Sequence, residues 1–351
     1  MKILYLGNEV CRITSGYDSL NSRNLKLLKD CADVFVEVVE FEKCNLYDKL
    51  SLYIGGSSRK YITKIRKMLA REEYDMLFFC SSMLGPVMKE IRKSYPHIVM
   101  VCNFHNIERH YAFEYLKVGG IKHLPFYLAA CKAEKMAVKS MDHAIVLTSK
   151  DKLLMKEIYN KDADIVLPVC YEDVGDMIGY KQENMGNRLE LLFVGTAFFA
   201  NIEGLRWFIA QVLPHVNATL TVVGRGMEKV ENLSSEKVIV KGFVPDLSAE
   251  YRSADIVVAP ILSGGGMKTK IAEALMYGKT VVGTSVALEG YIKDGKATIL
   301  ADDSSQFIRI LTDASAFPKK FNEFSRDIFL KEYSLEAVRD KFLNALNSWV
   351  R

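Results

Sequence analysis

The amino-acid sequence predicts an α/β fold with two doubly wound, Rossmann-like domains that face each other across a cleft. Short apolar runs alternate with amphipathic helical patterns, which is typical of parallel sheets with right-handed crossovers. This alternation stops near residue 170 and restarts near residue 189. The chain has 351 residues, which is long for a single domain. We therefore expect two domains joined by a linker.

The first domain, assigned to residues 1–169, begins with an apolar run that ends in Gly7. Helical patterns with apolar residues three and four positions apart separate the later apolar runs. We expect strands at residues 2–6, 34–38, 75–80, 97–102, 143–147 and 164–167, and helices at 20–31, 61–69, after Pro86, at 124–140 and at 150–159. Residues 8–18 are expected to form a polar loop, and residues 103–120 a polar, aromatic-rich connection.

Residues 170–188 lack periodicity and carry glycines and charges, so we expect them to be the linker. The second domain, residues 189–332, repeats the strand and helix pattern. Its strands are expected at 191–194, 219–223, 238–240, 256–259, 280–283 and 298–300, and its helices at 202–213, 247–252, 267–277 and 306–313. A final helix within residues 333–351 is expected to cross back to the first domain.

Composition excludes several classes of protein. Hydrophobic residues make up 49% of the chain and charged residues 26%, which is ordinary for a soluble globular protein. The net charge of +4 is only mildly basic and does not suggest a nucleic-acid binder. It is compatible with anionic small ligands or with an acidic membrane surface.

The expected location is cytoplasmic, with at most a peripheral contact at the inner face of the membrane. No apolar run is long enough to span a bilayer, and the first run is too short for a signal peptide. The seven cysteines all precede residue 171, and none forms a C-x-x-C pair or a metal-binding pattern. Such scattered thiols fit a reducing compartment.

Three consecutive glycines, Gly264 to Gly266, lie between an apolar strand and a helical pattern. Glycines let backbone N–H groups approach a ligand closely, and a helix N-terminus favours an anion. Lys268 is expected in the first helical turn, where it adds a positive charge. Glu273 is expected off the buried face of the helix. The loop therefore predicts a pocket for phosphate and hydroxyl groups, although Lys268 could simply be solvated and Glu273 could pair with Lys270.

Glycines recur where the strands of the second half end. Because the carboxyl ends of parallel strands meet at one edge of the sheet, these residues should line one ligand site. They are Gly195-Thr196, Gly224-Arg225-Gly226, Gly242-Phe243-Val244, Ser263 to Gly266, and Glu289-Gly290.

Several of these segments together resemble a known family. They are residues 191–195, 204–208, 223–226, 242–246 and 264–274, the last running on to Gly278. They are similar to the donor domain of glycosyltransferases with two Rossmann-like domains, the GT-B fold, in family 4 and its relatives. The resemblance is strong over residues 190–311 and weaker before them.

The resemblance implies transfer of a sugar from a nucleotide sugar held mainly by the second domain. In the family motif, two glutamates flank seven residues. The second glutamate corresponds to Glu273, which would bind the nucleotide ribose, but Gly265 stands where the first is usual. The family's arginine and lysine after the first strand of this domain are also absent, because Thr196, Phe198, Phe199 and Asn201 occupy that loop.

The resemblance also assigns roles in the first domain. His105 follows a strand and would face the sugar, and Ser15-Gly16 takes the place of a glycine loop. Glu289 corresponds to a carboxylate on the donor side. The departing diphosphate would be stabilised by Lys268, Arg225 and the glycine amides without a metal ion.

The candidate residues fall into two groups. The catalytic candidates are His105, Lys268 and Glu273, and the donor-binding candidates are Gly16, Gly195, Thr196, Arg225, Gly242, Phe243, Val244, Gly264, Gly265, Gly266, Met267 and Glu289. His105 would orient the sugar or assist proton transfer. Glu108, His110 and Asp142 remain alternatives for that role, although His110 is expected to face solvent.

Three other patterns have ordinary explanations as well as functional ones. Asp162-Ala-Asp164 matches a metal-nucleotide signature of a different glycosyltransferase fold, but we interpret it as chance. Basic residues 59–71 form an amphipathic helix that could lie on anionic lipid or simply face solvent. Residues 124–128 could touch a membrane, although interdomain packing is favoured.

The sequence supports three functional hypotheses. The first is a metal-independent, retaining glycosyltransferase of surface polysaccharide or glycoconjugate biosynthesis. It would use a UDP-sugar, or alternatively a GDP-sugar, with a sugar, lipid-linked or protein-linked acceptor and no further cofactor. The second is a non-catalytic binding subunit, and the third a nucleotide-sugar epimerase of the same fold. A Rossmann dehydrogenase is disfavoured, because no G-x-G-x-x-G follows the first strand.

Overall fold

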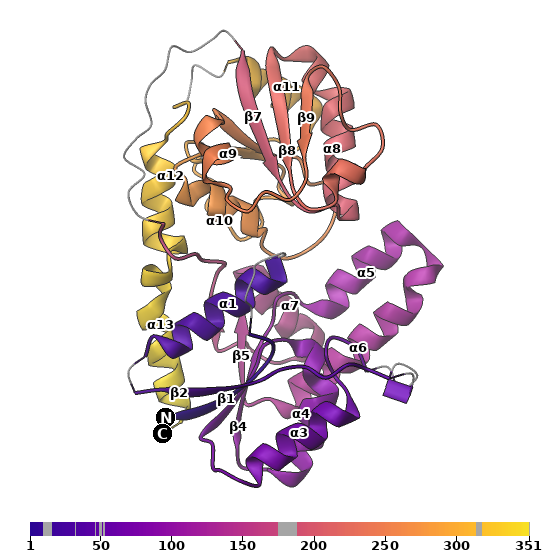
Figure 1. The fold of residues 1–351 in the computed structure, drawn as a ribbon, viewed down its shortest axis with the longest axis vertical. Coiled ribbons are helices and arrows are strands. Elements are labelled where there is room, and N and C mark those ends of the chain that lie inside the picture. The colour runs from indigo at the N-terminus through magenta and orange to yellow at the C-terminus, as the bar shows by residue number, and fades with distance from the viewer. Residues whose placement is uncertain are drawn as a thin grey trace. The chain divides into compact units, whose positions relative to one another are not determined.

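The computed structural model describes residues 1–9, 16–31, 33–45, 47–48, 51, 53–174, 188–313 and 318–350. It divides the chain into two compact units, each built on a parallel sheet (Figure 1). The N-terminal unit contains residues 1–168 and the end of the chain from Val338 onward, and the C-terminal unit contains residues 169–337. The prediction of two Rossmann-like domains is confirmed. Most of the expected linker, residues 175–187, lies outside the described residues.

The N-terminal unit contains a six-stranded sheet in the order β2-β1-β3-β4-β5-β6. The strands are β1 (Lys2–Leu6), β2 (Phe35–Val39), β3 (Met76–Phe79), β4 (Val99–Asn103), β5 (His143–Val146) and β6 (Ile165–Val166). All five pairings are parallel. The chain first extends the sheet from β1 to β2 and then continues on the other side of β1 with β3. This reversal is a switch point, beside which open α/β sheets bind their ligands.

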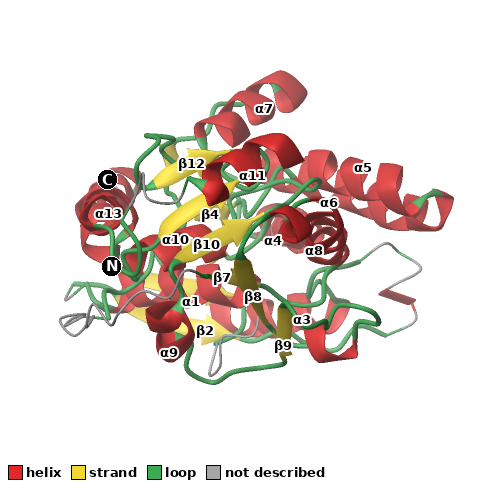
Figure 2. Cartoon of the chain, turned by 90° about the horizontal axis from the view of Figure 1, so that it is seen from above, coloured by secondary structure: helices red, strands yellow, loops and turns green. Residues whose placement is uncertain are grey.

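Helices connect these strands (Figure 2). They are α1 (Gly16–Lys29), α3 (Arg59–Leu69), η1 (Ser82–Leu84), α4 (Gly85–Ser94), α5 (Glu108–Gly119), η2 (Ile121–His123), α6 (Leu124–Ser140) and α7 (Ser149–Tyr159). Helix α1 begins at Gly16, so the polar loop expected up to residue 18 is shorter, and Ser15 lies outside the described residues. The connection expected at residues 103–120 is wrong over most of its length, because α5 forms there.

Helix α5 depends on a distant carboxylate. Glu134, fully buried on α6, accepts hydrogen bonds from the backbone N–H groups of Glu108 and Arg109. These N–H groups belong to the first turn of α5, and N–H groups of a first turn have no acceptors within their own helix. Tyr159 donates to the same carboxylate at 2.6 Å. A cap supplied by α6 leaves no signal in the local sequence of α5, which explains the wrong prediction.

The end of the chain packs into the N-terminal unit. Helix α13 (Leu335–Trp349) presents Phe342 edge-on to Phe78 of β3, with ring centroids 6.4 Å apart. Further along, Trp349 stacks on His143, with centroids 4.6 Å apart and ring planes 10° from parallel. Phe342 is fully buried, so α13 completes the core of this unit.

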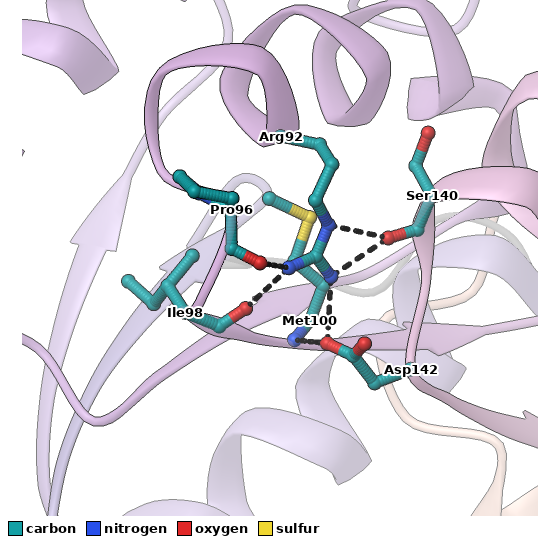
Figure 3. A network of polar contacts seen from close by, with 6 residues as sticks. All are labelled: Arg92, Pro96, Ile98, Met100, Ser140 and Asp142. Carbon is teal, nitrogen blue, oxygen red and sulfur yellow. Dashed lines mark hydrogen bonds and ion pairs between the residues drawn. The ribbon is translucent and has the colours of Figure 1, made fainter.

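Arg92 ties together the amino ends of β4 and β5 (Figure 3). Its guanidinium donates to the carbonyl oxygens of Ser140, Pro96 and Ile98 and to Asp142 Oδ2, at 2.6–3.0 Å. The same Asp142 oxygen accepts from Met100 N at 2.8 Å. Asp142 therefore has a structural role at the edge opposite the carboxyl ends of the strands. This placement argues against Asp142 as an alternative to His105.

The C-terminal unit contains a second parallel sheet in the order β12-β11-β10-β7-β8-β9. Its strands are β7 (Leu189–Val194), β8 (Ala218–Val223), β9 (Val238–Lys241), β10 (Ile256–Ala259), β11 (Thr280–Gly283) and β12 (Thr298–Leu300). The chain runs from β7 outward to β9 and then returns to the other side of β7 with β10. The switch point of this sheet therefore lies between β7 and β10.

The expected helices of this unit are present within one to three residues of their predicted starts. They are α8 (Phe199–Gln211), α9 (Ser248–Ser253), α10 (Thr269–Met276) and α11 (Ser304–Thr312), with short turns η3 (Leu213–His215) and η4 (Met227–Lys229). Two further elements, α12 (Glu323–Ile328) and the π-helical η6 (Phe329–Tyr333), were not predicted. Asn322, fully buried, caps α12 and also donates to Thr280 Oγ1 and Lys296 O.

Candidate functional site

The glycine-rich loops of the C-terminal unit leave the sheet at one edge. Gly195 follows β7, Gly224 follows β8, Gly242 follows β9, and the three glycines follow β10. Two of these loops touch through their backbones, because a Cβ at Gly224 would lie 1.9 Å from Gly195 O. The backbone of Gly224 also has φ +157°, where side chains are rarely found. This contact fixes the two loops beside the switch point.

Lys268 differs from its prediction. Helix α10 begins at Thr269, so Lys268 precedes the helix instead of lying in its first turn. Its ammonium donates to Gly266 O at 2.6 Å and to Gly265 O at 3.1 Å. The lysine is half-buried and holds the glycine loop in shape while placing a charge beside it. It is therefore not the simply solvated lysine of the alternative interpretation.

Met267 is buried, and its sulfur accepts a hydrogen bond from Val169 N at 3.2 Å. The structure thus places this side chain in the packing of the C-terminal unit. A contact of Met267 with a nucleotide, as predicted, would therefore have to come from its backbone.

Lys270 is the residue that the sequence analysis missed. Its ammonium donates to Asn201 Oδ1 at 2.7 Å and lies 4.0 Å from the centre of the Phe193 ring. A Cβ at Gly195 would lie only 2.8 Å from this nitrogen. Lys270 therefore reaches from α10 to the carboxyl end of β7, directly beside the switch point. The alternative pairing of Lys270 with Glu273 is wrong.

The pKa of Lys270 makes its charge sensitive to a bound anion. Burial, together with the positive charge of Lys268, lowers its pKa to about 7. A bound phosphate would raise this pKa again, because a nearby opposite charge favours the charged form of lysine. The resemblance called for basic residues in the loop after β7, and this loop contains none. Asn201, which lies in the first turn of α8 and not in the loop, instead contacts Lys270, supplied by α10.

Glu273 is half-buried and anchored from one side. Its Oε2 accepts from the hydroxyl of Tyr251 at 3.0 Å, and Tyr251 stacks on Tyr277 with centroids 4.5 Å apart. Burial raises the pKa of Glu273 to about 7, against the effect of the Tyr251 hydrogen bond. Within the described residues, Oε1 has no hydrogen-bond partner, so this oxygen is available to a ligand hydroxyl.

The other residues predicted to bind the donor also follow carboxyl ends of strands in this unit. They are exposed or half-buried, and comprise Thr196, Arg225, Gly242, Phe243, Val244 and Glu289. Of the glycines, Gly264 and Gly265 are half-buried and Gly266 is buried.

His105 of the N-terminal unit lies just beyond the end of β4 and is only 6% exposed. Its ring meets that of Tyr17 edge-on, with centroids 4.7 Å apart. Burial lowers the pKa of His105 to about 3, and the Arg23 guanidinium contributes, against a hydrogen bond with the Cys80 backbone. The imidazole is therefore neutral near pH 7.

The Nε2 atom of His105 is buried and has no hydrogen-bond partner in the part of the chain that the structure describes. The same holds for Ser82 Oγ and for both amide atoms of Asn103. An unpaired buried polar atom costs about 1–3 kcal/mol, so such atoms usually meet a ligand or water. These residues follow or end strands β3 and β4, at the carboxyl edge of the sheet. The arrangement suits recognition of hydroxyl groups.

Gly16 and the two alternative residues near His105 are also placed. Gly16 is half-buried at the start of α1, and His110 is half-buried on α5. Glu108 is buried, and burial together with the Glu134 carboxylate raises its pKa to about 8. Burial raises the pKa of Glu134 to about 7.

We predict that replacing Glu108 with glutamine stabilises the protein at alkaline pH. The folded-state pKa of Glu108 lies above its unfolded value, so the native protein keeps a proton that the unfolded chain releases. Stability therefore falls as the pH rises from about 4.5 to about 8. Glu108→Gln should raise the free energy of unfolding at pH 8.5 by about 1–3 kcal/mol and change little at pH 5.

Urea denaturation at the two pH values measures this difference. Glu114→Gln, at a half-buried position on the same helix, is the matched control and should show no such pH dependence. Equal effects of Glu108→Gln at both pH values would contradict the prediction.

The two aspartates of the Asp162-x-Asp164 pattern have structural partners. Asp162 pairs with Lys156 at 2.7 Å, and Asp164 contacts His143 Nδ1 and Ala144 N at the amino end of β5. Over the described ranges, no cluster of three or more His, Cys, Asp or Glu side chains is placed to hold a metal ion.

Comparison with known proteins fits this geometry. Residues 188–315 match the family model described as glycosyl transferases group 1. An uncharacterized 44.6 kDa protein in the cps region of Klebsiella pneumoniae is 27% identical over 208 residues. That alignment covers 54% of this chain and 52% of the relative, so it spans about half of each.

Solved structures resemble the whole chain. HepE of Anabaena, in complex with UDP and glucose, has a TM-score of 0.69 at 15% identity, covering 99% of this chain and 100% of HepE. The lipopolysaccharide outer core galactosyltransferase WaaB has a TM-score of 0.71 at 14% identity, covering 99% of each chain. TarM of S. aureus has a TM-score of 0.69 at 11% identity, covering 98% and 99%.

At these identities the solved structures establish the fold, which is the GT-B fold of two Rossmann-like domains. The family model of glycosyl transferases group 1 matches residues 188–315, which include the range where the sequence resemblance is strong. The predicted GT-B fold is confirmed, and the family match over residues 188–315 agrees with the predicted glycosyltransferase domain.

Proposed function

We propose that this protein transfers a sugar from a nucleotide sugar, with a UDP-sugar favoured, to an acceptor in surface polysaccharide or glycoconjugate biosynthesis. The observation that supports it most is the placement of Lys270, Asn201 and Gly195 beside the switch point, next to the loop held by Lys268. HepE has been solved with UDP-glucose, and the Klebsiella relative comes from a cps region. Both favour this substrate and this pathway type.

In the proposed reaction, the C-terminal unit holds the nucleotide diphosphate. Lys270, Lys268 and the amides of the glycine loop stabilise the charge that develops on the diphosphate as its bond to the sugar breaks. Arg225, exposed on the loop after β8, adds to this field. Glu273 accepts a hydrogen bond from the ribose through Oε1. These positive groups can do the work of a metal ion, so we propose a metal-independent transfer.

The N-terminal unit contributes His105 to the recognition of a sugar hydroxyl. Because the ring is neutral, its unpartnered Nε2 accepts a hydrogen bond instead of repelling or donating. Retention of the anomeric configuration follows from the family resemblance and belongs to the proposal. A sugar, lipid-linked or protein-linked molecule is the expected acceptor.

The proposed location is cytoplasmic, with a peripheral contact at the inner face of the membrane. Within the described residues, none of the helices combines the length and hydropathy needed to span a bilayer. The basic helix that could lie on lipid or simply face solvent is α3, whose apolar residues Tyr61, Ile62 and Ile65 are buried in its own unit. Only the charged face of α3 is therefore open to a membrane.

Calorimetric titration with UDP, GDP, ADP and CMP tests the donor site. We expect one nucleotide to bind, and Lys270→Met to weaken it by about 10–100-fold, since charge-assisted hydrogen bonds contribute about 1.5–3 kcal/mol. Lys268→Ala and Glu273→Gln should also weaken it. Lys331→Met, at an exposed position of the same unit, is the matched control.

Proton uptake gives this titration a second readout. Because the pKa of Lys270 is about 7 in the free protein and rises beside a diphosphate, binding at pH 8 should take up protons. The slope of binding enthalpy against buffer ionisation enthalpy measures the uptake, which Lys270→Met should abolish. Failure of all four nucleotides to bind would overturn the proposed donor site.

Product analysis separates the remaining alternatives. Gly265 stands where the family has a glutamate, so a non-catalytic binding subunit is one of these alternatives. Such a subunit would bind the nucleotide without releasing it from the sugar. An epimerase would convert the sugar without an acceptor, whereas a transferase needs one.

A further inference from the structure

Helices α5 and α6 form a hairpin that extends away from the sheet of the N-terminal unit (Figures 1 and 2). We call residues 117–125, which join the two helices, the hairpin tip. Its large apolar side chains face outward, with Ile121 84%, Val118 50% and Leu124 37% exposed. Phe113 and Leu128 extend this exposed apolar surface along the two helices.

The charged residues of the hairpin tip itself are lysines. From Tyr115 to Ala133 the sequence contains Lys117, Lys122 and Lys132 and no acidic residue. Lys122 is exposed and has no ion pair within the described residues. Lys117 pairs with Glu114 at 2.9 Å. The exposed apolar residues therefore lie among positive charges.

The base of the hairpin is firmly packed, so the exposed tip is held in place. Ala112 of α5 packs with Ala130 and Ala133 of α6 and with Met83, and Phe126 and Tyr127 pack against this cluster. The Glu134 carboxylate caps α5 from within the same core. The turn itself is braced by Tyr115, whose ring lies 4.1 Å from that of His123.

A rigid tip with exposed aliphatic side chains and adjacent lysines matches the chemistry of an anionic bilayer surface. Exposed apolar patches of this kind mark interaction sites. Aliphatic side chains enter the boundary between headgroups and acyl chains, while lysines contact anionic headgroups. A protein partner would require an acidic surface with an apolar groove. No feature of the described residues points to such a partner.

We propose that the hairpin tip docks on an anionic lipid surface, with Val118, Ile121 and Leu124 entering the interface and Lys117 and Lys122 contacting headgroups. Docking at this tip does not depend on the nucleotide site, so either proposal can fail while the other stands. The sequence left open a membrane contact by residues 59–71 or by residues 124–128, and this proposal assigns the contact to the hairpin tip.

Co-sedimentation with vesicles tests the docking. The protein should bind vesicles of phosphatidylcholine mixed with phosphatidylglycerol and not vesicles of phosphatidylcholine alone. The double variant Ile121→Glu, Leu124→Glu should lower the affinity at least about tenfold, because two exposed aliphatic groups that would enter the lipid interface become charges. Leu153→Glu on α7 is the matched control, since Leu153 is also exposed, at 70%. Circular dichroism checks that each variant is folded.

A tryptophan reporter gives a direct readout. Ile121→Trp fluorescence should shift to the blue on addition of anionic vesicles and be quenched by brominated acyl chains, whereas Leu153→Trp fluorescence should not. Absence of wild-type binding, or equal binding of the double variant, would overturn the proposal. So would concentration-dependent self-association, measured by light scattering, that the double variant abolishes, because the tip would then bind a second copy of the chain.

Discussion

Replacing His105 with alanine is expected to lower the transfer rate by about 10²–10⁴-fold while leaving nucleotide affinity unchanged. His105 lies in the N-terminal unit and the glycine loops lie in the C-terminal unit, so the substitution removes no contact of the proposed nucleotide pocket. It removes the Nε2 atom that is proposed to accept a hydrogen bond from a sugar hydroxyl. Initial rates with the donor identified by calorimetry measure the effect.

Two further variants distinguish recognition by Nε2 from a merely structural role. His105→Gln, which offers an amide oxygen as acceptor, should recover part of the rate. His97→Ala, at an exposed position just before the amino end of the same strand, is the control and should be fully active. Full activity of His105→Ala would remove His105 from the proposed site.

The pH dependence of the rate adds a signature. The pKa of His105 is lowered to about 3, so its ring stays neutral between pH 5 and 8. An ordinary histidine titrates near pH 6.5, and a rate that depends on its charge changes there. We expect no change of rate near pH 6.5 that is present in the wild type and absent in His105→Ala. Such a change of rate near pH 6.5 would mean that the His105 ring is not kept neutral by burial.

Replacing Arg92 with alanine should lower the free energy of unfolding by about 2–4 kcal/mol. The guanidinium joins three backbone carbonyls and Asp142 across the starts of β4 and β5. Removing it leaves these acceptors without a donor at a half-buried position. The exposure of Asp142 limits the contribution of the ion pair itself, so most of the effect comes from the carbonyls.

Urea denaturation with circular dichroism measures this loss. Arg92→Lys should recover little, because one ammonium cannot reach acceptors that the planar guanidinium spans. Lys93→Ala removes the neighbouring exposed pair with Glu90 and should change stability by less than about 1 kcal/mol. Equal effects of Arg92→Ala and Lys93→Ala would contradict the structural role of the network.

The sequence predicts the strands and most helices because their evidence is local. Apolar runs of strand length and helical spacing of apolar residues are both visible within a short window. Helix α5 was not predicted, because the carboxylate that caps it belongs to Glu134, 26 residues from Glu108. Helix α12 differs, because its cap, Asn322, directly precedes the helix, while the amide nitrogen of the same residue donates to β11 and to the loop before β12. Caps supplied by tertiary contacts have no pattern in the segment they stabilise.

The candidate site was predictable at the level of loops but not of individual atoms. Glycines at strand ends identify the edge of the sheet, and the structure places those glycines there. The contact of Lys270 with Asn201 joins residues 69 positions apart, so spacing could not suggest it. Nor could spacing show that Lys268 turns back to its own loop or that the Met267 sulfur is buried. Such orientations depend on packing between elements.

Helix α13 makes the N-terminal unit discontinuous in the order of synthesis. Phe342 completes its core, yet a ribosome adds this residue after every residue of the C-terminal unit. Domains normally fold as units during translation, beginning at the N-terminus. Here the first unit to emerge keeps Phe78 uncovered until the last helix is made. The nascent chain therefore carries an exposed apolar surface for most of its synthesis, and the C-terminal unit is the first that can finish folding.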